Sequence, residues 1–304
     1  MTNNSKSLSE QINDIKNAKM SRKDKIQALI KLGIRENEAV VILPVEHREP
    51  AHRFTFTFGV EIECVMPRMQ FEAVANVTGV PYQFESYNHR DNREYFKFTT
   101  DASICTTRGR EGSPIECVSP ILDGTKNGFD KLEACCKALN EAGAYVNTST
   151  GLHVHIGASE LNSTQYVNVF KNYKMLQNVI SSFLAPSRRN AYYCAPLTDH
   201  NFAYCSNRVD VLNEMDNDRY HAVNPKSYGA HGTIEFRQHQ GTTNFTKIKN
   251  WVNFCAKLVA YSMNNVIEHE VASIDEIPFL SAAEKRFFKS RQSAVNGNRE
   301  REAA

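Results

Sequence analysis

The sequence predicts an α+β protein in which helices pack on one face of a β-sheet. Segments in which apolar and polar residues alternate, rich in β-branched and aromatic side chains, indicate strands. Longer segments with apolar residues at helical spacing indicate amphipathic helices. The two kinds of segment do not alternate strictly, as they would around a parallel sheet, so the mixed class is favoured.

Residues 1–50 are predicted to form a helical extension. The segments SLSEQINDIKNA, SRKDKIQALIKLG and RENEAVVIL each have a short helical pattern, and Gly33 is expected to end the second helix. The proline-containing segment ILPVEHREPAHRF is typical of a linker. A structural arm is the favoured interpretation, and the alternatives are a docking element for a partner, an oligomerisation element and a helix-turn-helix.

Residues 54–290 mix strand and helix patterns in one predicted domain, and residues 291–304 are predicted to be a polar tail. The strand patterns are FTFGVEIECV, EYFKFTTDA, SPIECVSPI, GLHVHIGA, DRYHAVN and GTIEFRQHQ. The helical patterns are RMQFEAVANV, NGFDKLEACCKALNEAG, STQYVNVFKNYKMLQNVISSFLA and NFTKIKNWVNFCAKLVAYSMNNVIEH, the third with Ser163 as its expected N-cap.

The composition argues against several classes of function. Lys and Arg number 36 against 34 Asp and Glu, so the chain carries no strong signal for nucleic acid as a partner. No apolar run approaches the roughly 20 residues that span a membrane, and the first residues lack the apolar core of a secretory signal. The eight cysteines form no C-x-x-C pair and lie on apparent core faces, so we expect a reduced, cytoplasmic protein without a covalent cysteine mechanism.

Four predicted strands combine an apolar face with a charged one. In TFTFGVEIEC, Glu61 and Glu63 point to one face and Ile62 to the other. Two carboxylates about 7 Å apart repel each other unless a cation lies between them, although a solvated sheet face is the simpler alternative. The other charged faces carry Glu116; His153 and His155; and Glu235, Arg237 and His239.

If these faces belong to one sheet, they form a surface of carboxylates, imidazoles and a guanidinium with almost no lysine. Mg²⁺ and Mn²⁺ bind such carboxylate oxygens and keep positions for water and phosphate, while arginine clamps phosphate or carboxylate. The pattern therefore predicts a nucleotide-processing site. Because the sequence has no glycine-rich phosphate loop, metals and basic side chains would have to hold the phosphates.

A set of motifs between about residues 54 and 270 resembles the amidoligase family, in the superfamily of carboxylate–amine ligases similar to glutamine synthetase and glutamate–cysteine ligase. The motifs are, in order, GVEIE, TDASI, PIECVSPIL, GLHVHIG, SRRNAYYCAPL, RYHAVN and TIEFRQHQGT. The resemblance implies a curved antiparallel sheet, with ATP and Mg²⁺ (or Mn²⁺) on its concave face and helices on its convex face. It also implies amide or isopeptide bond formation through an acyl phosphate, on a peptide, amino acid or related metabolite.

The resemblance also implies roles for individual residues, although Ala102 stands where the family pattern has glycine. The expected metal ligands are Glu61, Glu63, Glu116, His155 and Glu235. The expected catalytic residues are Asp101, Glu235 and Arg237, and the expected contacts to nucleotide or substrate are His153, Arg188, Arg219, Tyr220 and Asn224.

Two other functions compete with this one. The H-x-H strand is also compatible with a zinc-dependent hydrolase, although the excess of carboxylates over histidines favours hard cations. A catalytically inactive binding protein with the ligase fold is the third possibility, disfavoured because buried carboxylates without metals would be destabilising. The sequence does not identify the carboxylate donor, the amine acceptor, the number of metals or the adenine-binding residues.

Overall fold

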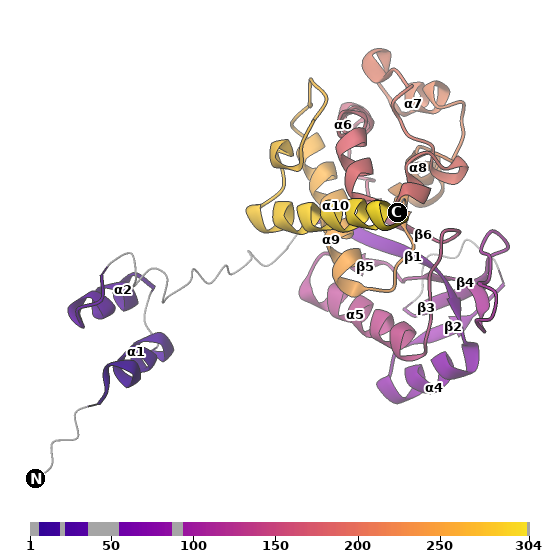
Figure 1. The fold of residues 1–304 in the computed structure, drawn as a ribbon. Helices are drawn as coiled ribbons and strands as arrows, with labels where there is room; N and C mark the ends of the chain where they lie inside the picture. The colour runs from indigo at the N-terminus through magenta and orange to yellow at the C-terminus, as the bar shows by residue number, and fades with distance from the viewer. Residues whose placement is uncertain (1–5, 19–21, 36–54, 87–93, 303–304) are drawn as a thin grey trace, which may run out of the picture. The chain divides into compact units, whose positions relative to one another are not determined.

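The computed structural model describes residues 6–18, 22–35, 55–86 and 94–302, which belong to two compact units, 1–51 and 52–304 (Figure 1). The first unit contains helices α1 (Leu8–Asn17) and α2 (Arg22–Lys31). Ser7 and Glu10 form a capping box at the start of α1, and the two helices share a small apolar cluster around Leu29. Gly33 follows α2 with a φ of +89°, in the left-handed region that was predicted for a helix end. The third predicted helix lies outside the described residues.

The second unit is built on an eight-stranded sheet, and the predicted α+β class is confirmed. The strands are β1 (Thr57–Met66), β2 (Tyr82–Phe84), β3 (Phe96–Thr100), β4 (Ser113–Val118), β5 (Leu122–Asp123), β6 (Gly151–Gly157), β7 (Val223–Asn224) and β8 (Thr233–Gln240). Their order is β2-β3-β4-β1-β6-β8-β7, with β5 paired to β1. Only β2 and β3 pair in parallel; the other pairs are antiparallel, and the open sheet is consistent with the curved sheet expected.

Helices flank the sheet, with α5 in contact with β5 and α9 in contact with β6. The α-helices of this unit are α4 (Arg68–Thr78), α5 (Lys126–Glu141), α6 (Ser163–Phe183), α7 (Arg208–Glu214), α8 (Ser227–His231), α9 (Phe245–Ser262) and α10 (Ala282–Glu302). Short 3-10 helices lie at Pro186–Arg188, Tyr192–Cys194, Phe202–Tyr204 and Ile274–Glu276. The segment predicted as a polar tail is therefore helical as far as Glu302.

The N-cap of α6 is Asn162, so the prediction of Ser163 was wrong by one residue. The Asn162 side chain accepts a hydrogen bond from the Gln165 amide at 3.0 Å, and the Gln165 side chain accepts one from the Asn162 amide. Asparagine caps a helix as well as serine does, and the reciprocal bond from Gln165 favours the earlier start.

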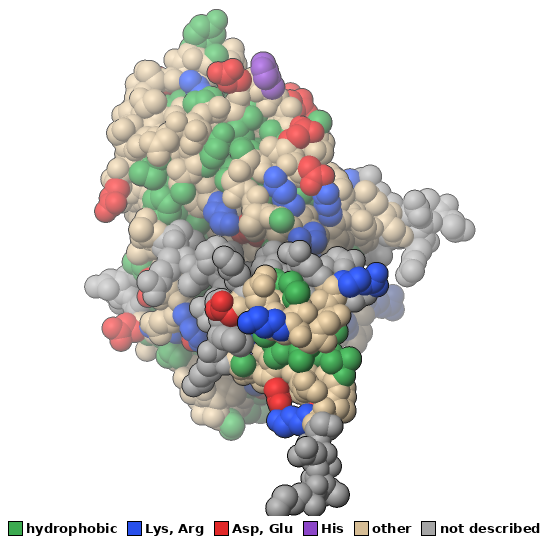
Figure 2. Space-filling view, turned by 90° about the vertical axis from the view of Figure 1, so that its left-hand side faces the viewer, with side chains coloured by type: hydrophobic (Ala, Val, Ile, Leu, Met, Phe, Trp, Pro, Cys, Tyr) green, Lys and Arg blue, Asp and Glu red, His purple; other side chains and the backbone are tan. Residues whose placement is uncertain are grey.

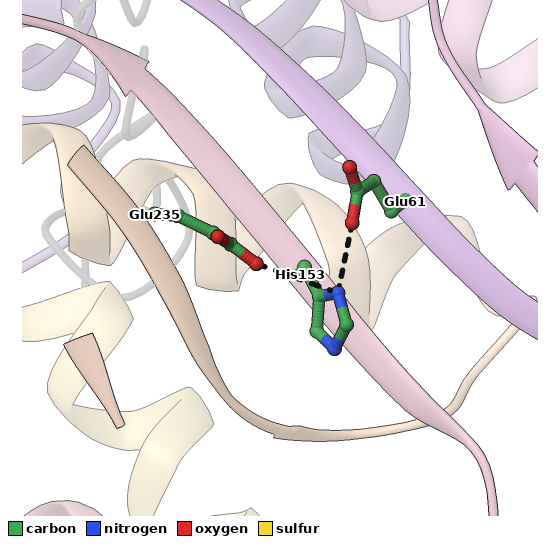
Figure 3. Close-up of side chains that lie close together, drawn as sticks. All are labelled: Glu61, His153 and Glu235. Atoms are coloured by element: carbon green, nitrogen blue, oxygen red, sulfur yellow. Dashed lines mark hydrogen bonds and ion pairs between the residues drawn. The ribbon is translucent and has the colours of Figure 1, made fainter. Parts of the chain in front are cut away.

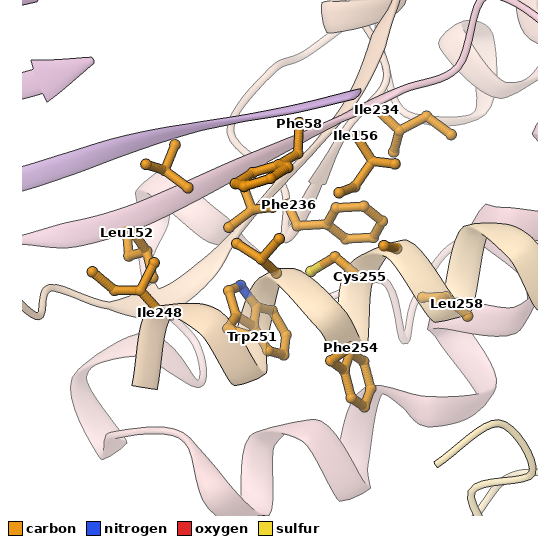
Figure 4. Close-up of a cluster of buried hydrophobic side chains, with 14 of the residues drawn as sticks. Phe58, Leu152, Ile156, Ile234, Phe236, Ile248, Trp251, Phe254, Cys255 and Leu258 are labelled. Carbon is orange, nitrogen blue, oxygen red and sulfur yellow. The ribbon is translucent and has the colours of Figure 1, made fainter. Parts of the chain in front are cut away.

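The hydrophobic core lies between the sheet and the helices. Figure 4 shows side chains of β1, β6 and β8, including Phe58, Ile156 and Phe236, packed against α9 through Trp251 and Cys255. Burying each such side chain stabilises the fold by about 1.5–3 kcal/mol. Because successive strand residues point to opposite faces, this packing directs the glutamates of the same strands away from the helices.

A β-bulge in β8 corrects one prediction about the charged face. Val154 pairs with Phe236, but Leu152 pairs with His239, so β8 has one more residue than β6 across this interval. The alternation therefore shifts, and the His239 ring lies 5.4 Å from the Trp251 ring, among the helices. The prediction that His239 shares a face with Glu235 and Arg237 was wrong for this reason.

The face drawn in Figure 2 carries side chains of both signs of charge. On the face of the molecule drawn in Figure 2, acidic and basic side chains lie interspersed. Within the ranges that the structure describes, no helix has both the length and the apolar character of a membrane span.

Candidate functional site

The strand register places the predicted site residues opposite one another on the face away from the helices. Glu63 of β1 pairs with Glu116 of β4, and Glu61 of β1 pairs with His153 of β6. His155 of β6 pairs with Glu235 of β8. Directly opposed residues have Cβ atoms about 4.5–5.5 Å apart, so charged groups from four strands converge on one surface. We call Glu61, Glu63, Glu116, His153 and Glu235 the carboxylate cluster.

The first group of possible metal ligands consists of Glu61, His153 and Glu235 (Figure 3). The His153 Nδ1 atom lies 2.9 Å from Glu61 Oε2 and 3.6 Å from Glu235 Oε1. One donor atom from each of the three residues lies within 4.8 Å of the others. Oxygen and imidazole donors at this spacing fit a hard divalent cation with an added imidazole ligand.

The second group consists of Glu63, Glu116 and His153. The His153 Nε2 atom lies 3.3 Å from Glu63 Oε1, and the Gly151 amide donates a hydrogen bond of 2.6 Å to Glu63 Oε2. The two groups therefore share His153, each facing a different nitrogen of its ring.

His155 lies beside the first group without belonging to it. Its Nε2 atom is 3.3 Å from Glu61 Oε1, and its Nδ1 atom lies 2.9 Å from the Thr233 hydroxyl and 3.2 Å from the Ser227 hydroxyl. The sequence predicted His155 as a metal ligand and His153 as a phosphate contact. In the structure it is His153 that joins both groups of possible ligands.

Electrostatic repulsion within the cluster is concentrated on Glu116. Burial and the charges of Glu61, Glu63, Asp101 and Glu235 raise the pKa of Glu116 well above its usual value. A cation would relieve the same repulsion that otherwise favours a bound proton. The donor set therefore fits one or more divalent cations.

Two further glutamates of the cluster, Glu61 and Glu235, are held in the charged form. Burial alone would raise the pKa of Glu61, but the imidazoles of His153 and His155 hold it well below the usual carboxyl value. Burial likewise opposes ionisation of Glu235, whose pKa is nevertheless lowered, first by Arg237 and then by His155. The cluster thus keeps carboxylates ionised in a largely dry environment, which is the form that binds metals.

Glu235 is fixed from both sides. The Arg237 guanidinium donates to Glu235 Oε1, and the Asn224 side-chain amide donates to Glu235 Oε2 at 2.6 Å. Arg237 Nε also donates to the Tyr193 carbonyl at 3.3 Å. Asn224, predicted to contact phosphate or substrate, therefore orients a carboxylate in this structure.

A polar cavity of about 170 Å³ adjoins the second group. We call it the polar cavity; it is lined by Glu63, Asp101, Ser103, Glu116, Ser149, His153, Arg188, Tyr193, Arg219, Tyr220 and Arg237. Each of the predicted residues Asp101, Arg188, Arg219 and Tyr220 thus faces the same space. Three guanidinium groups beside three carboxylates suit a ligand that carries anionic groups and metals together.

Arg188 gives the polar cavity an unsatisfied donor. The side chain is buried and its Nη2 atom donates to the Arg237 carbonyl at 2.7 Å, but its Nε atom has no hydrogen-bond partner among the residues that the structure describes. A buried donor without a partner costs about 1–3 kcal/mol, which an anionic ligand would offset. A Cβ atom at Gly151 would lie 2.9 Å from Arg188 Nη2, so this glycine gives the guanidinium its room.

The sequence did not single out Tyr193, Ser103 and Ser149 as cavity residues. Tyr193 belongs to a set of ring contacts with Tyr192 and Tyr220 at 5.2 and 5.5 Å between centroids. The motif SRRNAYYC contains both tyrosines, but only its arginines suggested chemistry. Ser103 belongs to the motif TDASI, in which only Asp101 was given a role, whereas Ser149 has no pattern that could have identified it.

A comparison with protein families identifies the family of the segment that contains this site. The model of the family described as "putative amidoligase enzyme" matches residues 55–259, which include every residue of the carboxylate cluster. No curated protein matches the chain significantly.

Proposed function

The chain belongs to the putative amidoligase family, and from this premise we propose that it is an ATP-dependent ligase that joins a carboxylate to an amine through an acyl phosphate. The observation that carries the proposal is the convergence of two groups of possible metal ligands on His153, beside a cavity with three arginines. Phosphoryl transfer from ATP to a carboxylate is catalysed mainly by positioning and electrostatic stabilisation, and these residues would supply both.

The cluster would hold Mg²⁺ or Mn²⁺. A neutral imidazole has one nitrogen with a free lone pair, so His153 can be a ligand of only one cation. We propose that Nδ1 of His153 binds a cation together with Glu61 and Glu235, while its Nε2–H donates to Glu63. A second cation would then depend on the oxygens of Glu63 and Glu116. When bound, these cations would neutralise the charge of the triphosphate and of the attacking carboxylate.

The arginines would stabilise negative charge during the reaction. In the first step, a substrate carboxylate oxygen forms a bond to the γ-phosphorus and ADP leaves. In the second step, the amine nitrogen attacks the acyl carbon. The bond between the acyl carbon and the phosphate oxygen breaks, phosphate leaves with its electron pair, and the amine gives up a proton. We assign Arg237 to the phosphoryl oxygens, Arg188 to the phosphate or the substrate carboxylate, and Asp101 to the departing proton.

The substrate is proposed to be an anionic peptide, amino acid or related metabolite. Arg188 and Arg219 line the polar cavity, and a guanidinium binds carboxylate through two parallel hydrogen bonds. The guanidinium carbons of Arg219 and Arg237 lie 5.5 and 6.0 Å from the centroid of the Tyr220 ring, so this ring makes a cation–π contact with each arginine.

Calorimetric titration with a non-hydrolysable ATP analogue, with and without Mg²⁺, tests the nucleotide site. We expect Mg²⁺-dependent binding to the wild type and loss of at least tenfold in affinity for Glu63→Gln. Glu133→Gln, on the exposed face of α5, is the matched control and should bind as the wild type does. Absence of nucleotide binding together with tightly held zinc would overturn the proposal in favour of a hydrolase. Absence of both would favour an inactive binding protein.

A further inference from the structure

A second cavity reaches the carboxylate cluster but differs from the polar cavity in chemistry. It has a volume of about 170 Å³, and its lining includes Glu61 of the cluster and the adjacent His155. The rest of its lining is mostly apolar or backbone, and none of the described residues that line it is Asp, Lys or Arg. We call it the apolar cavity.

One wall of the apolar cavity is an apolar ridge at the end of β4. Val118, Pro120 and Ile121 line this wall, and the Ile121 side chain is 62% exposed. His231 also lines the cavity, with its ring perpendicular to that of His155 at 5.9 Å between centroids. An exposed isoleucine and an imidazole around one cavity provide surfaces on which a flat ring can pack.

Gly59 lines the apolar cavity, and contacts within the described part of the protein do not require a glycine at this position. A Cβ atom at Gly157 or Gly232 would come within 2.6 Å of a neighbouring hydroxyl, so packing explains those two glycines. At Gly59 the nearest atoms of the described residues would be Ser119 Oγ at 3.7 Å and His155 Cβ at 3.9 Å, which are ordinary contacts. Glycine inside a strand is destabilising relative to alanine and often marks the close approach of a ligand.

We propose that the apolar cavity binds the nucleobase of the nucleotide whose phosphates lie at the carboxylate cluster. The inference rests on the proposed function, because it needs a nucleotide at that cluster. The cavity is smaller than the roughly 300 Å³ at which pockets hold whole drug-sized ligands, so it suits a single planar ring system. Because Glu61 of the cluster and the adjacent His155 line this cavity, the phosphates have a path to the metals, and the polar cavity remains for the γ-phosphoryl group and the acidic substrate.

Two Mg²⁺-bound ligands separate the base from the phosphates: a non-hydrolysable ATP analogue and inorganic tripolyphosphate, which has no base. We expect the wild type to bind the analogue at least tenfold more tightly than tripolyphosphate. Gly59→Val fills the cavity and should remove that difference, while its affinity for tripolyphosphate stays within about twofold of the wild type. Gly59→Ala, whose Cβ fits, should weaken the analogue less.

Ile121→Ser provides the same test without threatening the fold, because the Ile121 side chain is exposed. It should weaken binding of the analogue severalfold and leave tripolyphosphate unchanged. If both variants bind the analogue as tightly as the wild type does, the apolar cavity does not hold the base, although the proposed function stands. If neither ligand binds the wild type in the presence of Mg²⁺, the proposed function fails, and this inference fails with it.

Discussion

The two faces of the central sheet are built from the same strands and have opposite energetics. On the helix side, Ile62 and Phe236 are completely buried among apolar neighbours, where leaving water stabilises the fold. On the other side, Glu63 and Glu235 are only 6% and 4% exposed, and burial of their charges is unfavourable unless partners compensate for it. Apolar burial on the helix side therefore stabilises the fold. This stabilisation offsets the unfavourable burial of mutually repelling carboxylates on the other side.

Two histidines make the same contrast within one pair of strands. Burial beside Trp251 lowers the pKa of His239 to about 3, so this ring is neutral in the folded protein. Burial would also lower the pKa of His155, but the carboxylates of Glu61 and Glu235 reverse the effect and raise it. The pKa is therefore lowered for the histidine on the helix side of the sheet and raised for the histidine on the carboxylate side.

The largest expected effect distinguishes the two faces by stability. Trp251→Ala should lower the free energy of unfolding by about 3–5 kcal/mol, because it leaves a cavity under the sheet. Glu61→Gln should abolish ligase activity with a smaller loss of stability than Trp251→Ala, since the amide keeps the shape of the side chain but gives up the charge that His153 and His155 favour. Urea denaturation and an activity assay measure both. A loss of stability in Glu61→Gln as large as that in Trp251→Ala would return Glu61 to a structural role.

A smaller effect concerns Mg²⁺ and the carboxylate face. A ligand at 100 times its dissociation constant stabilises the folded state by about 2.7 kcal/mol, so Mg²⁺ should raise the melting temperature of the wild type. Glu116→Gln should be more stable than the wild type without Mg²⁺, because it relieves the repulsion that raises the pKa of Glu116, and it should respond less to the ion. Thermal melts with Glu133→Gln as the control test this expectation. Equal Mg²⁺ responses in all three proteins would exclude Glu116 as a ligand.

The smallest expected effect is the pH dependence contributed by His239. Because its pKa is lowered on folding, the unfolded chain binds the extra proton, so this contribution is present above about pH 6.5 and is lost as the pH falls toward 3. Between pH 6 and 5 the loss should be roughly 1 kcal/mol. His239→Gln should flatten the stability profile in that interval, as measured by urea denaturation at each pH. An unchanged slope would mean that the ring is not kept neutral by burial.

The sequence predicted the alternation of the strands well, because period two is a local property of the chain. The separation of Glu61 and Glu63 from Ile62 and Cys64 needed no knowledge of neighbouring strands. The pairing of Glu63 with Glu116 could not be predicted, because register is set by contacts between segments far apart in the chain. The register places Glu116 near both glutamates of β1, and after burial it is first Glu61 and then Glu63 that raise the pKa of Glu116.

Errors and omissions arose where tertiary structure changed a local pattern. The bulge in β8 moved His239 to the helix side, and Asn162 replaced Ser163 as a cap because of its reciprocal bond with Gln165. Tyr193 and His231 come to the two cavities on loops and short helices, whose positions depend on the whole fold. The match over residues 55–259 confirmed the family but leaves the substrates to experiment.

The extra residue in β8 changes which face of the sheet the side chains of that strand point to. Glu235 and Arg237 lie at the candidate site. The next residue, Gln238, accepts a hydrogen bond from Tyr173 of α6, and His239 packs on Trp251 of α9. One continuous strand thereby anchors itself in the core within two residues of the guanidinium that it presents. The position of Arg237 therefore depends on how α6 and α9 pack against β8. Substitutions of Tyr173 or Trp251 in the core should shift the Arg237 guanidinium at the candidate site.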